Sequence, residues 1–210
     1  MSQSFSDVIT NKDDLRALIG FPSELSLRKE ITWLDNHCQL LISQSPFLLI
    51  SSSGSDGRCD VSPRGDAPGF VVVLDEKTLL IPDRTGNKRA DTLLNVLENP
   101  HLGLLFMIPT MEETLRVNGR AKIVRDADLM AKMEFRGKTP QLALGVEVDE
   151  VFLQCAKALK RSHLWEPGHW PRRSELPTLA QMLMDQAKPE GLTVDALDCA
   201  LEEAYRTKLY

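Results

Sequence analysis

Three cations, Arg84, Lys88 and Arg89, surround Gly86 and Asn87 where an apolar run ends and an amphipathic stretch begins. The first turn of a helix presents free backbone N–H groups and the positive end of the helix dipole, and flanking cations add selectivity for phosphate. The same cations oppose the dipole and destabilise the helix by about 0.3 kcal/mol or more each unless an anion compensates them. Residues 83–89 therefore indicate an anion site, with a solvated basic turn as the alternative.

A further arginine, Arg64, lies at the end of an earlier apolar run, in the segment Ser62-Pro63-Arg64-Gly65-Asp66. From a neighbouring strand its guanidinium could reach the same anion as the basic turn. The alternative is a turn arginine that pairs with Asp66. Both interpretations are open at the level of the sequence.

Other familiar catalytic patterns are missing from the sequence. It contains no phosphate-binding loop, dinucleotide-binding glycine motif, nucleophile elbow, zinc-protease motif or kinase set. The four histidines lack the spacing of metal ligands, and Cys155, His163 and His169 form at most a loose cluster, so we expect no metal site. Motifs alone therefore leave the catalytic residues unknown.

The elements that must position these residues are mostly short strands. Apolar or alternating runs between turn residues predict strands at 47–52, 60–63, 69–74, 78–82, 102–108 and 114–124, and a last strand near 144–148. Alternation within residues 114–124 places Leu115 and Val117 on one face and Thr114 and Arg116 on the other. A bulge is expected at Gly119.

Amphipathic helices flank this series of strands. From Ser23, a candidate N-cap, an apolar side chain every three or four residues predicts one continuous helix that Pro46 ends. A second helix, capped by Asn87, carries its apolar face on Ala90, Leu93, Leu94 and Leu97. Further helices are expected beyond Val151.

Antiparallel strands with few helices favour a closed barrel over a doubly wound sheet. The sequence therefore predicts a mainly β fold, a six-stranded antiparallel β-barrel with flanking helices, in one structural domain. Residues 1–45 are expected to form a helical segment that packs on the barrel, residues 46–153 the barrel core, and residues 154–210 the C-terminal helices and an interface loop.

The composition is that of an ordinary globular chain. A net charge of -5 and a pI near 5.4 argue against a nucleic acid or an anionic membrane as main partner, because both require a basic face. The four cysteines include no CxxC pair, no segment has a signal-peptide pattern, and no apolar run approaches a membrane span. We therefore expect a cytoplasmic protein.

Several segments form a joint pattern: Ser45-Pro46-Phe47-Leu48, Asp60-Val61-Ser62-Pro63-Arg64-Gly65-Asp66, Leu80-Ile81-Pro82-Asp83-Arg84, Gly86-Asn87-Lys88-Arg89, Asp91-Thr92-Leu93 and Thr114-Leu115-Arg116-Val117-Asn118-Gly119. As a set they resemble the pyridoxamine 5'-phosphate oxidase-like family of split β-barrels that bind flavin mononucleotide (FMN). A later piece, Cys155-Ala156-Lys157-Ala158 with Arg161-Ser162 and Leu164-Trp165, resembles a largely uncharacterised subgroup. The C-terminal arginine and histidine motif of the true vitamin B6 oxidase has no clear counterpart after Trp170, so the resemblance does not extend to that substrate.

The resemblance implies a homodimer with FMN in a cleft at the subunit interface. The phosphate would be held by Arg64 and by the basic turn with Arg84, Asn87, Lys88 and Arg89. The other cofactor contacts would come from Ile81, Pro82 and Asp83 along the ribityl chain or ring, from Thr114 and Arg116 beside the flavin, and from Arg161, Ser162 and Trp165 of the second subunit.

The resemblance also implies an oxidoreductase that moves a hydride between FMN and a small phosphorylated or heterocyclic substrate. A cation near the N1/C2 edge of the flavin would stabilise its reduced anionic form, and Arg116 and Lys157 are the candidates. The alternatives are a flavin-binding or sensing protein without catalysis, and a binder of another flat cofactor such as haem or a deazaflavin.

Overall fold

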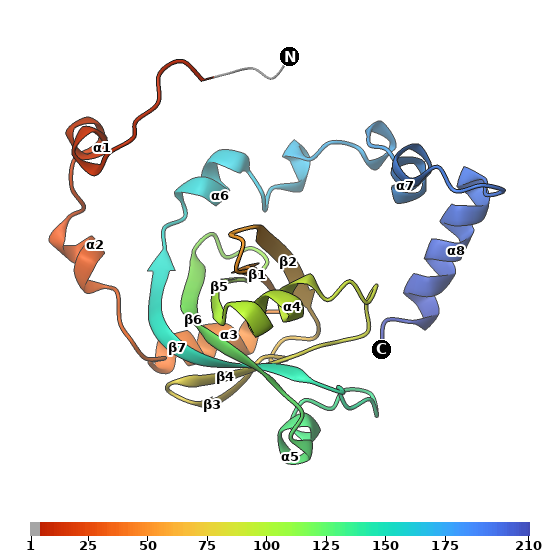
Figure 1. Ribbon diagram of the computed structural model, residues 1–210, viewed down its shortest axis with the longest axis horizontal. Coiled ribbons are helices and arrows are strands. Elements are labelled where there is room, and N and C mark those ends of the chain that lie inside the picture. The colour runs from red at the N-terminus through yellow and green to blue at the C-terminus, as the bar shows by residue number, and fades with distance from the viewer. Residues whose placement is uncertain (1–4) are drawn as a thin grey trace.

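The computed structural model describes residues 5–210, which form a curled sheet with helices around it (Figure 1). The sheet has seven strands in the order β2-β1-β5-β6-β7-β4-β3, and all neighbouring strands are antiparallel. The strands are β1 (Phe47–Ser53), β2 (Cys59–Gly65), β3 (Val72–Asp75), β4 (Thr78–Pro82), β5 (His101–Met107), β6 (Thr114–Val124) and β7 (Ala143–Gln154). The predicted antiparallel barrel with flanking helices is confirmed. The sheet has seven strands rather than six, because all seven of the apolar or alternating runs form strands, including the short edge strand β3 beside β4.

The interior of the barrel follows from the alternation of side chains along each strand. In β6, Leu115 and Val117 are buried, whereas Arg116 is partly exposed on the other face. The pairing of β6 with β7 shifts register just before Gly119, so the predicted bulge is present. A Cβ at Gly119 would lie 2.2 Å from the Glu147 backbone oxygen, so a larger residue cannot follow the same path.

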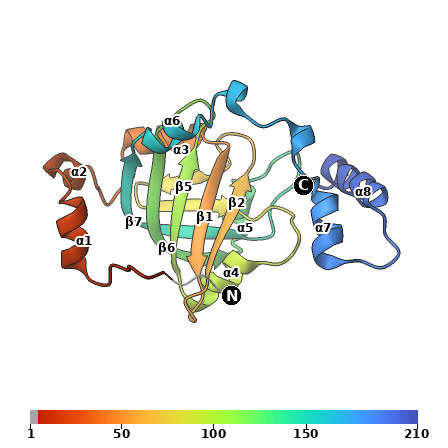
Figure 2. The same ribbon diagram turned by 90° about the horizontal axis from the view of Figure 1, so that it is seen from above.

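Helices α3 (Asn36–Gln44) and α4 (Asp91–Glu98) lie at opposite ends of the barrel (Figure 2). Cys38 and Ile42 of α3 and Val96 of α4 belong to the same buried cluster as the inward side chains of the strands. Burial of these side chains holds both helices against the barrel. The first turn of α4, which follows the basic turn, is therefore fixed at one rim.

The single helix expected from Ser23 is wrong, because the structure divides it into α2 (Glu24–Arg28) and α3. Ser23 caps α2, as expected, but Asp35 caps α3 and starts a separate helix. Between the two helices, Ile31 pairs with Val151 of β7 through backbone hydrogen bonds of 3.0 and 2.7 Å. The Ile31 backbone thus joins the sheet instead of a helix.

The N-terminal arm, residues 5–28, stands away from the barrel in both views (Figures 1 and 2). It carries α1 (Lys12–Ile19) and α2, and neither helix contains a buried residue. Its apolar side chains are exposed instead: Phe5, Val8, Ile9, Leu15, Leu18, Ile19, Phe21, Leu25 and Leu27. Within the N-terminal helical segment, packing against the barrel therefore begins with the partly buried Ile31, and full burial begins with Leu34.

The C-terminal arm starts at the end of β7, on the same side as the N-terminal arm, and crosses to the opposite side of the barrel, where α7 and α8 lie (Figure 1). Its elements are α6 (Lys157–Ser162), the 3-10 turns η1 (Pro167–His169) and η2 (Arg173–Glu175), α7 (Leu179–Ala187) and α8 (Val194–Thr207). Helices α7 and α8 are joined by a hydrogen bond from Thr178 to Asp198 at 3.3 Å. The remaining helix, α5 (Ala127–Ala131), covers the outer side of β4, where Met130 packs with Leu80.

None of the helices found in residues 5–210 is both long enough and apolar enough to cross a membrane.

Candidate functional site

The basic turn connects β4 to α4 through a strained backbone. Lys88 (φ 62°) and Ala90 (φ 60°) adopt the left-handed conformation, which costs an L-residue roughly 1–2 kcal/mol. Ala90 occupies the N-cap position and no side chain caps α4. Asn87 instead accepts a hydrogen bond from the Arg89 backbone N–H at 3.0 Å. The predicted capping role of Asn87 is therefore wrong: this side chain shapes the turn.

Carboxylates balance the charge of the basic turn. Arg89 Nε lies 2.9 Å from Asp91 Oδ2 on the protein surface. Asp91, and to a smaller extent Asp60, raises the pKa of Arg89 above its ordinary value. An exposed ion pair of this kind contributes little net free energy, so another anion can replace Asp91 at small cost. Lys88 is exposed beside this pair.

Arg64 lies beside the first turn of α4. Its Nη2 donates to Thr92 Oγ1 at 3.4 Å, and Thr92 in turn donates to Asp60 Oδ2 at 3.0 Å. Its Nη1 donates to the Pro63 carbonyl of its own strand at 2.9 Å. Burial raises the pKa of Asp83, and the positive charge of Arg64 offsets part of this rise. The structure thus brings together Arg64 from β2, Asp83 from the start of the basic turn and Thr92 from α4.

Thr92 and Asp60 are two residues of this group that the sequence did not single out as site residues. Thr92 is buried in the helical turn directly after the basic turn. Asp60 lies four residues before Arg64 on β2, so the alternation of a strand places both side chains on one face. That spacing is the signal by which Asp60 could have been found.

Arg84 occupies a different environment. Its Nε donates to Asp66 Oδ2 at 2.7 Å, and its Nη2 donates to the Met133 carbonyl at 2.9 Å. The side chains of Arg84 and Asp66 are 16% and 1% exposed. The other Asp66 oxygen accepts a hydrogen bond from the Tyr210 hydroxyl at 2.7 Å, which raises the pKa of Tyr210. Asp66 therefore pairs with Arg84 rather than with Arg64, and Arg84 uses these donors within the fold.

Strand register separates Arg64 from Arg116. Arg64 pairs with Leu48 of β1, which pairs with Phe106 of β5, which pairs with Leu115 of β6. Residues paired across strands share a face, and here it is the inward face. Arg116, next to Leu115, therefore points to the outer face. The two arginines therefore lie on opposite faces of the sheet.

The outer face of β6 carries the two residues expected beside the flavin. Thr114 is buried there, and its hydroxyl lies 3.4 Å from the Gln154 side chain. Arg116 Nη2 lies 3.6 Å from Glu150 Oε1, and its guanidinium lies 5.1 Å from the centre of the Phe152 ring. Both residues thus occupy a surface formed by β6 and β7.

The β4 residues expected along the cofactor are buried. Ile81 belongs to the main core cluster, and Pro82 beside it is buried as well. The Ile81 side chain fills the barrel, whereas Pro82, the next residue of the strand, points to the opposite face. Burial of both side chains leaves mainly backbone atoms of these two residues to border a ligand.

The contacts expected from a second subunit lie on α6 and just after it. Figures 1 and 2 both place α6 away from α4. Lys157 and Arg161 are exposed, and the Ser162 hydroxyl donates to a carbonyl of its own helix. Trp165 Nε1 donates to the Met111 carbonyl at 2.8 Å, which ties this segment to the β5–β6 connection. Within one chain these residues and the basic turn form separate groups.

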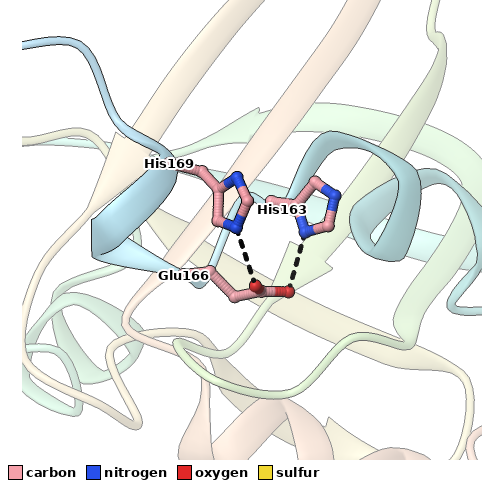
Figure 3. Close-up of side chains that lie close together, drawn as sticks. All are labelled: His163, Glu166 and His169. Atoms are coloured by element: carbon pink, nitrogen blue, oxygen red, sulfur yellow. Dashed lines mark hydrogen bonds and ion pairs between the residues drawn. The ribbon is translucent and has the colours of Figure 1, made fainter.

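A separate cluster lies after α6, where His163 and His169 meet around Glu166 (Figure 3). His163 Nδ1 is 3.0 Å from Glu166 Oε1, and His169 Nε2 is 3.4 Å from Glu166 Oε2. The two rings stack with their centres 4.1 Å apart. Cys155, which the sequence placed with these histidines, is not part of this group. Glu166 was missed, and its signal is the regular spacing of three residues between the members.

The pyridoxamine 5'-phosphate oxidase family model matches residues 34–155. This span is more than half of the 210-residue chain and contains α3 and all seven strands. No curated protein sequence matches the chain significantly.

The fold has similarity to several solved structures. HupZ from Group A Streptococcus is 16% identical, with 57% of this chain and 92% of that chain covered and a TM-score of 0.47. A putative pyridoxamine 5'-phosphate oxidase from Lactobacillus delbrueckii is 19% identical, with 58% and 95% covered and a TM-score of 0.47. HutZ, a haem storage protein from Vibrio cholerae, is 20% identical, with 58% and 93% covered and a TM-score of 0.41. The match of the family model across the whole barrel shows that the chain belongs to the pyridoxamine 5'-phosphate oxidase family.

Proposed function

We propose that the protein binds FMN as a homodimer and uses it as an oxidoreductase that acts on a small molecule. The observation that carries this proposal is the position of Arg64 beside the first turn of α4, 3.4 Å from Thr92. The turn before that helix carries Lys88 and Arg89 on a strained backbone. Strain of this kind persists where the surrounding structure enforces it, often at ligand sites.

The proposed phosphate clamp consists of Arg64, Lys88, Arg89 and the first backbone N–H groups of α4. A charged hydrogen bond contributes about 1.5–3 kcal/mol, and a helix N-terminus about 0.3–1 kcal/mol more for an anion. Arg89 exchanges its exposed partner Asp91 for the phosphate. Arg84 lies outside the clamp, because it is already bonded to buried Asp66.

A second copy of the chain completes the proposed site. Arg64 and Arg116 face opposite sides of one sheet, and α6 lies away from α4 (Figure 2). Thr114 and Arg116 and the residues Lys157, Arg161, Ser162 and Trp165 would therefore approach the cofactor held by the other chain. The exposed apolar side chains of the N-terminal arm also favour association, because burying each would contribute about 1.5–3 kcal/mol.

Bound FMN supplies the hydride chemistry, and the protein positions the ring and the substrate. Arg116 or Lys157 holds a positive charge at the edge of the ring and so favours its reduced anionic form. All four cysteines are free thiols, which fits the proposed cytoplasmic location. The net charge of -5 favours a small-molecule substrate over a nucleic acid.

Comparing FMN with riboflavin, which lacks the phosphate, tests the clamp directly. We expect Arg64→Ala and Lys88→Ala/Arg89→Ala to weaken FMN binding by about 10- to 150-fold, the equivalent of one charged hydrogen bond, in a fluorescence titration. Riboflavin affinity should stay the same in both variants. Lys138→Ala removes an exposed cation after α5 and serves as the control. Full FMN affinity in both clamp variants would reject the site.

Two further measurements address the dimer and the chemistry. Sedimentation of the loaded protein should give a dimer, and a monomer that still holds FMN tightly would reject the shared site.

NADH or NADPH should reduce the bound flavin, and a candidate acceptor should reoxidise it over many turnovers. Stoichiometric FMN binding without turnover would mean that the protein binds flavin but is not an oxidoreductase. Absorption bands of haem or a deazaflavin in the purified protein would mean that the cofactor is not FMN.

A further inference from the structure

We infer that the histidine cluster, His163, Glu166 and His169, is a binding site for a divalent transition-metal ion of the zinc type. The three side chains come from consecutive short elements: the C-cap of α6, the residue before η1, and the end of η1. In Figure 3 both imidazole rings stand over the same carboxylate. The inference is independent of flavin binding.

The spacing of the ligand atoms matches that around a single ion. Ligands about 2.1 Å from zinc at tetrahedral angles lie about 3.4 Å from one another. Here His163 lies 3.0 Å from one Glu166 oxygen and His169 lies 3.4 Å from the other. With one ligand atom taken from each residue, all three lie within 4.8 Å of one another. Small rotations of exposed side chains are therefore enough to place them around one ion.

The chemistry of the ligands selects the kind of ion. Two imidazole nitrogens with one carboxylate form a common zinc-binding set, whereas calcium and magnesium prefer oxygen ligands alone. Among the residues that the structure describes, no further histidine, cysteine or acidic side chain joins this group. Three protein ligands leave a fourth position for water, as in zinc sites that remain open to solvent.

The backbone holds the three side chains in place before any ion binds. The Glu166 N–H donates to the His163 carbonyl, and the His169 N–H donates to the Glu166 carbonyl, both at 2.9 Å. Two indole N–H groups anchor the same loop: Trp165 to Met111 at 2.8 Å and Trp170 to Leu164 at 3.0 Å. A loop organised in this way loses little conformational freedom when the ion binds.

The alternative is a surface ion pair between Glu166 and the two histidines. The three side chains are 45%, 54% and 57% exposed, and ion pairs at such positions contribute little to stability. A surface ion pair does not bind a metal ion stoichiometrically, so a measurement of metal binding distinguishes it from a metal site.

The test measures Co²⁺ and Zn²⁺ binding to the full chain after chelator treatment, by calorimetry and by the visible absorption of bound Co²⁺. The background variant Cys59→Ser/Cys155→Ser/Cys199→Ser removes the exposed thiols that also bind these ions. We expect one ion per chain. His163→Ala and His169→Ala should each weaken binding by at least about 100-fold, since loss of an outer-shell partner alone costs 10- to 100-fold.

Three comparisons make the result decisive. Glu166→Gln keeps the shape of the side chain but removes its charge, and it should also weaken binding. His37→Ala and His101→Ala remove exposed histidines elsewhere and should leave the affinity unchanged. Circular dichroism melting checks that each variant is folded. If a histidine variant does not fold, the metal affinity of Glu166→Gln decides between a metal site and a surface ion pair. Absence of a stoichiometric ion, or equal affinity in the cluster and control variants, would overturn the inference.

Discussion

Arg64 and Arg84 are the same type of residue with the same expected role, yet the structure places them in opposite environments. Arg84 donates to Asp66 and to a backbone carbonyl, and Asp66 is 1% exposed. Arg64 has only a 3.4 Å contact with Thr92 and a bond to its own strand. An arginine whose partner is buried is needed by the fold, whereas a weakly bonded one remains available to a ligand.

Removing Arg84 should have the largest effect on stability. Arg84→Ala leaves Asp66 buried without its counter-charge, which typically costs about 3–5 kcal/mol. Urea denaturation should show this loss in the free energy of unfolding. Arg64→Ala is the matched control, and its unfolding free energy should change by about 0.5 kcal/mol or less. Equal destabilisation by both variants would remove the distinction between the two arginines.

A double variant separates the ion pair from simple loss of packing. Arg84→Met/Asp66→Asn removes both charges while it keeps side chains of similar volume. Replacing a buried pair by neutral residues is often close to neutral in stability. We expect the double variant to be more stable than Arg84→Ala. If the double variant is less stable than Arg84→Ala, an uncompensated charge on Asp66 does not explain the destabilisation of Arg84→Ala.

Tyr210, which also contacts Asp66, should have a smaller effect on the free energy of unfolding than Arg84. Tyr210→Phe removes the hydroxyl that donates to Asp66 at 2.7 Å but keeps the ring, whose centre is 5.2 Å from that of Phe135. A hydrogen bond to a charged acceptor contributes about 1.5–3 kcal/mol, and we expect the lower end of this range because Tyr210 is not buried. Thermal unfolding should report this decrease. FMN affinity should not change, because the hydroxyl belongs to the Arg84 side and not to the proposed clamp.

Asp91 tests the proposed clamp that contains Arg64. Its removal should increase FMN affinity, and the effect should be small. Asp91→Asn removes the exposed carboxylate that competes with the phosphate for Arg89. Because exposed ion pairs are weak, we expect FMN affinity to rise by only roughly two- to threefold. Glu98→Gln removes a carboxylate from the other end of α4 and serves as control. A lower FMN affinity in Asp91→Asn would mean that Asp91 supports the clamp rather than competes for it.

Local sequence patterns predicted the barrel well. The alternation of Leu115 and Val117 with Arg116, and the bulge at Gly119, depend on neighbours in sequence, and both are present. Ile31 shows the limit of such patterns. Its spacing suits a helix, but its backbone pairs with distant Val151, and local periodicity carries no information about such a partner.

The candidate site was predictable in its residue types but not in its pairings. The partner of Arg84 is Asp66, while a second donor to Asp66 comes from Tyr210 near the far end of the chain. Such contacts depend on how distant segments pack. The spacing of His163, Glu166 and His169 was visible in the sequence, but only the turns after α6 showed that their side chains converge.

The smallest expected effect links Arg64 to the pH dependence of stability through Asp83. Burial raises the pKa of Asp83 above 3.8, and Arg64 counteracts this rise. A raised pKa means that the folded state favours the protonated carboxyl, so this contribution is present below the unfolded pKa and is lost as pH rises through the folded pKa. In Arg64→Ala the pKa of Asp83 should rise further, and stability should fall more with increasing pH than in the unmodified protein. Urea unfolding over a pH series should show this extra slope, and Arg64→Ala/Asp83→Asn should abolish it. Arg84→Ala should leave the contribution of Asp83 to the pH dependence of stability unchanged. The same extra slope in Arg84→Ala would show that both arginines act on Asp83 and would weaken the contrast between them.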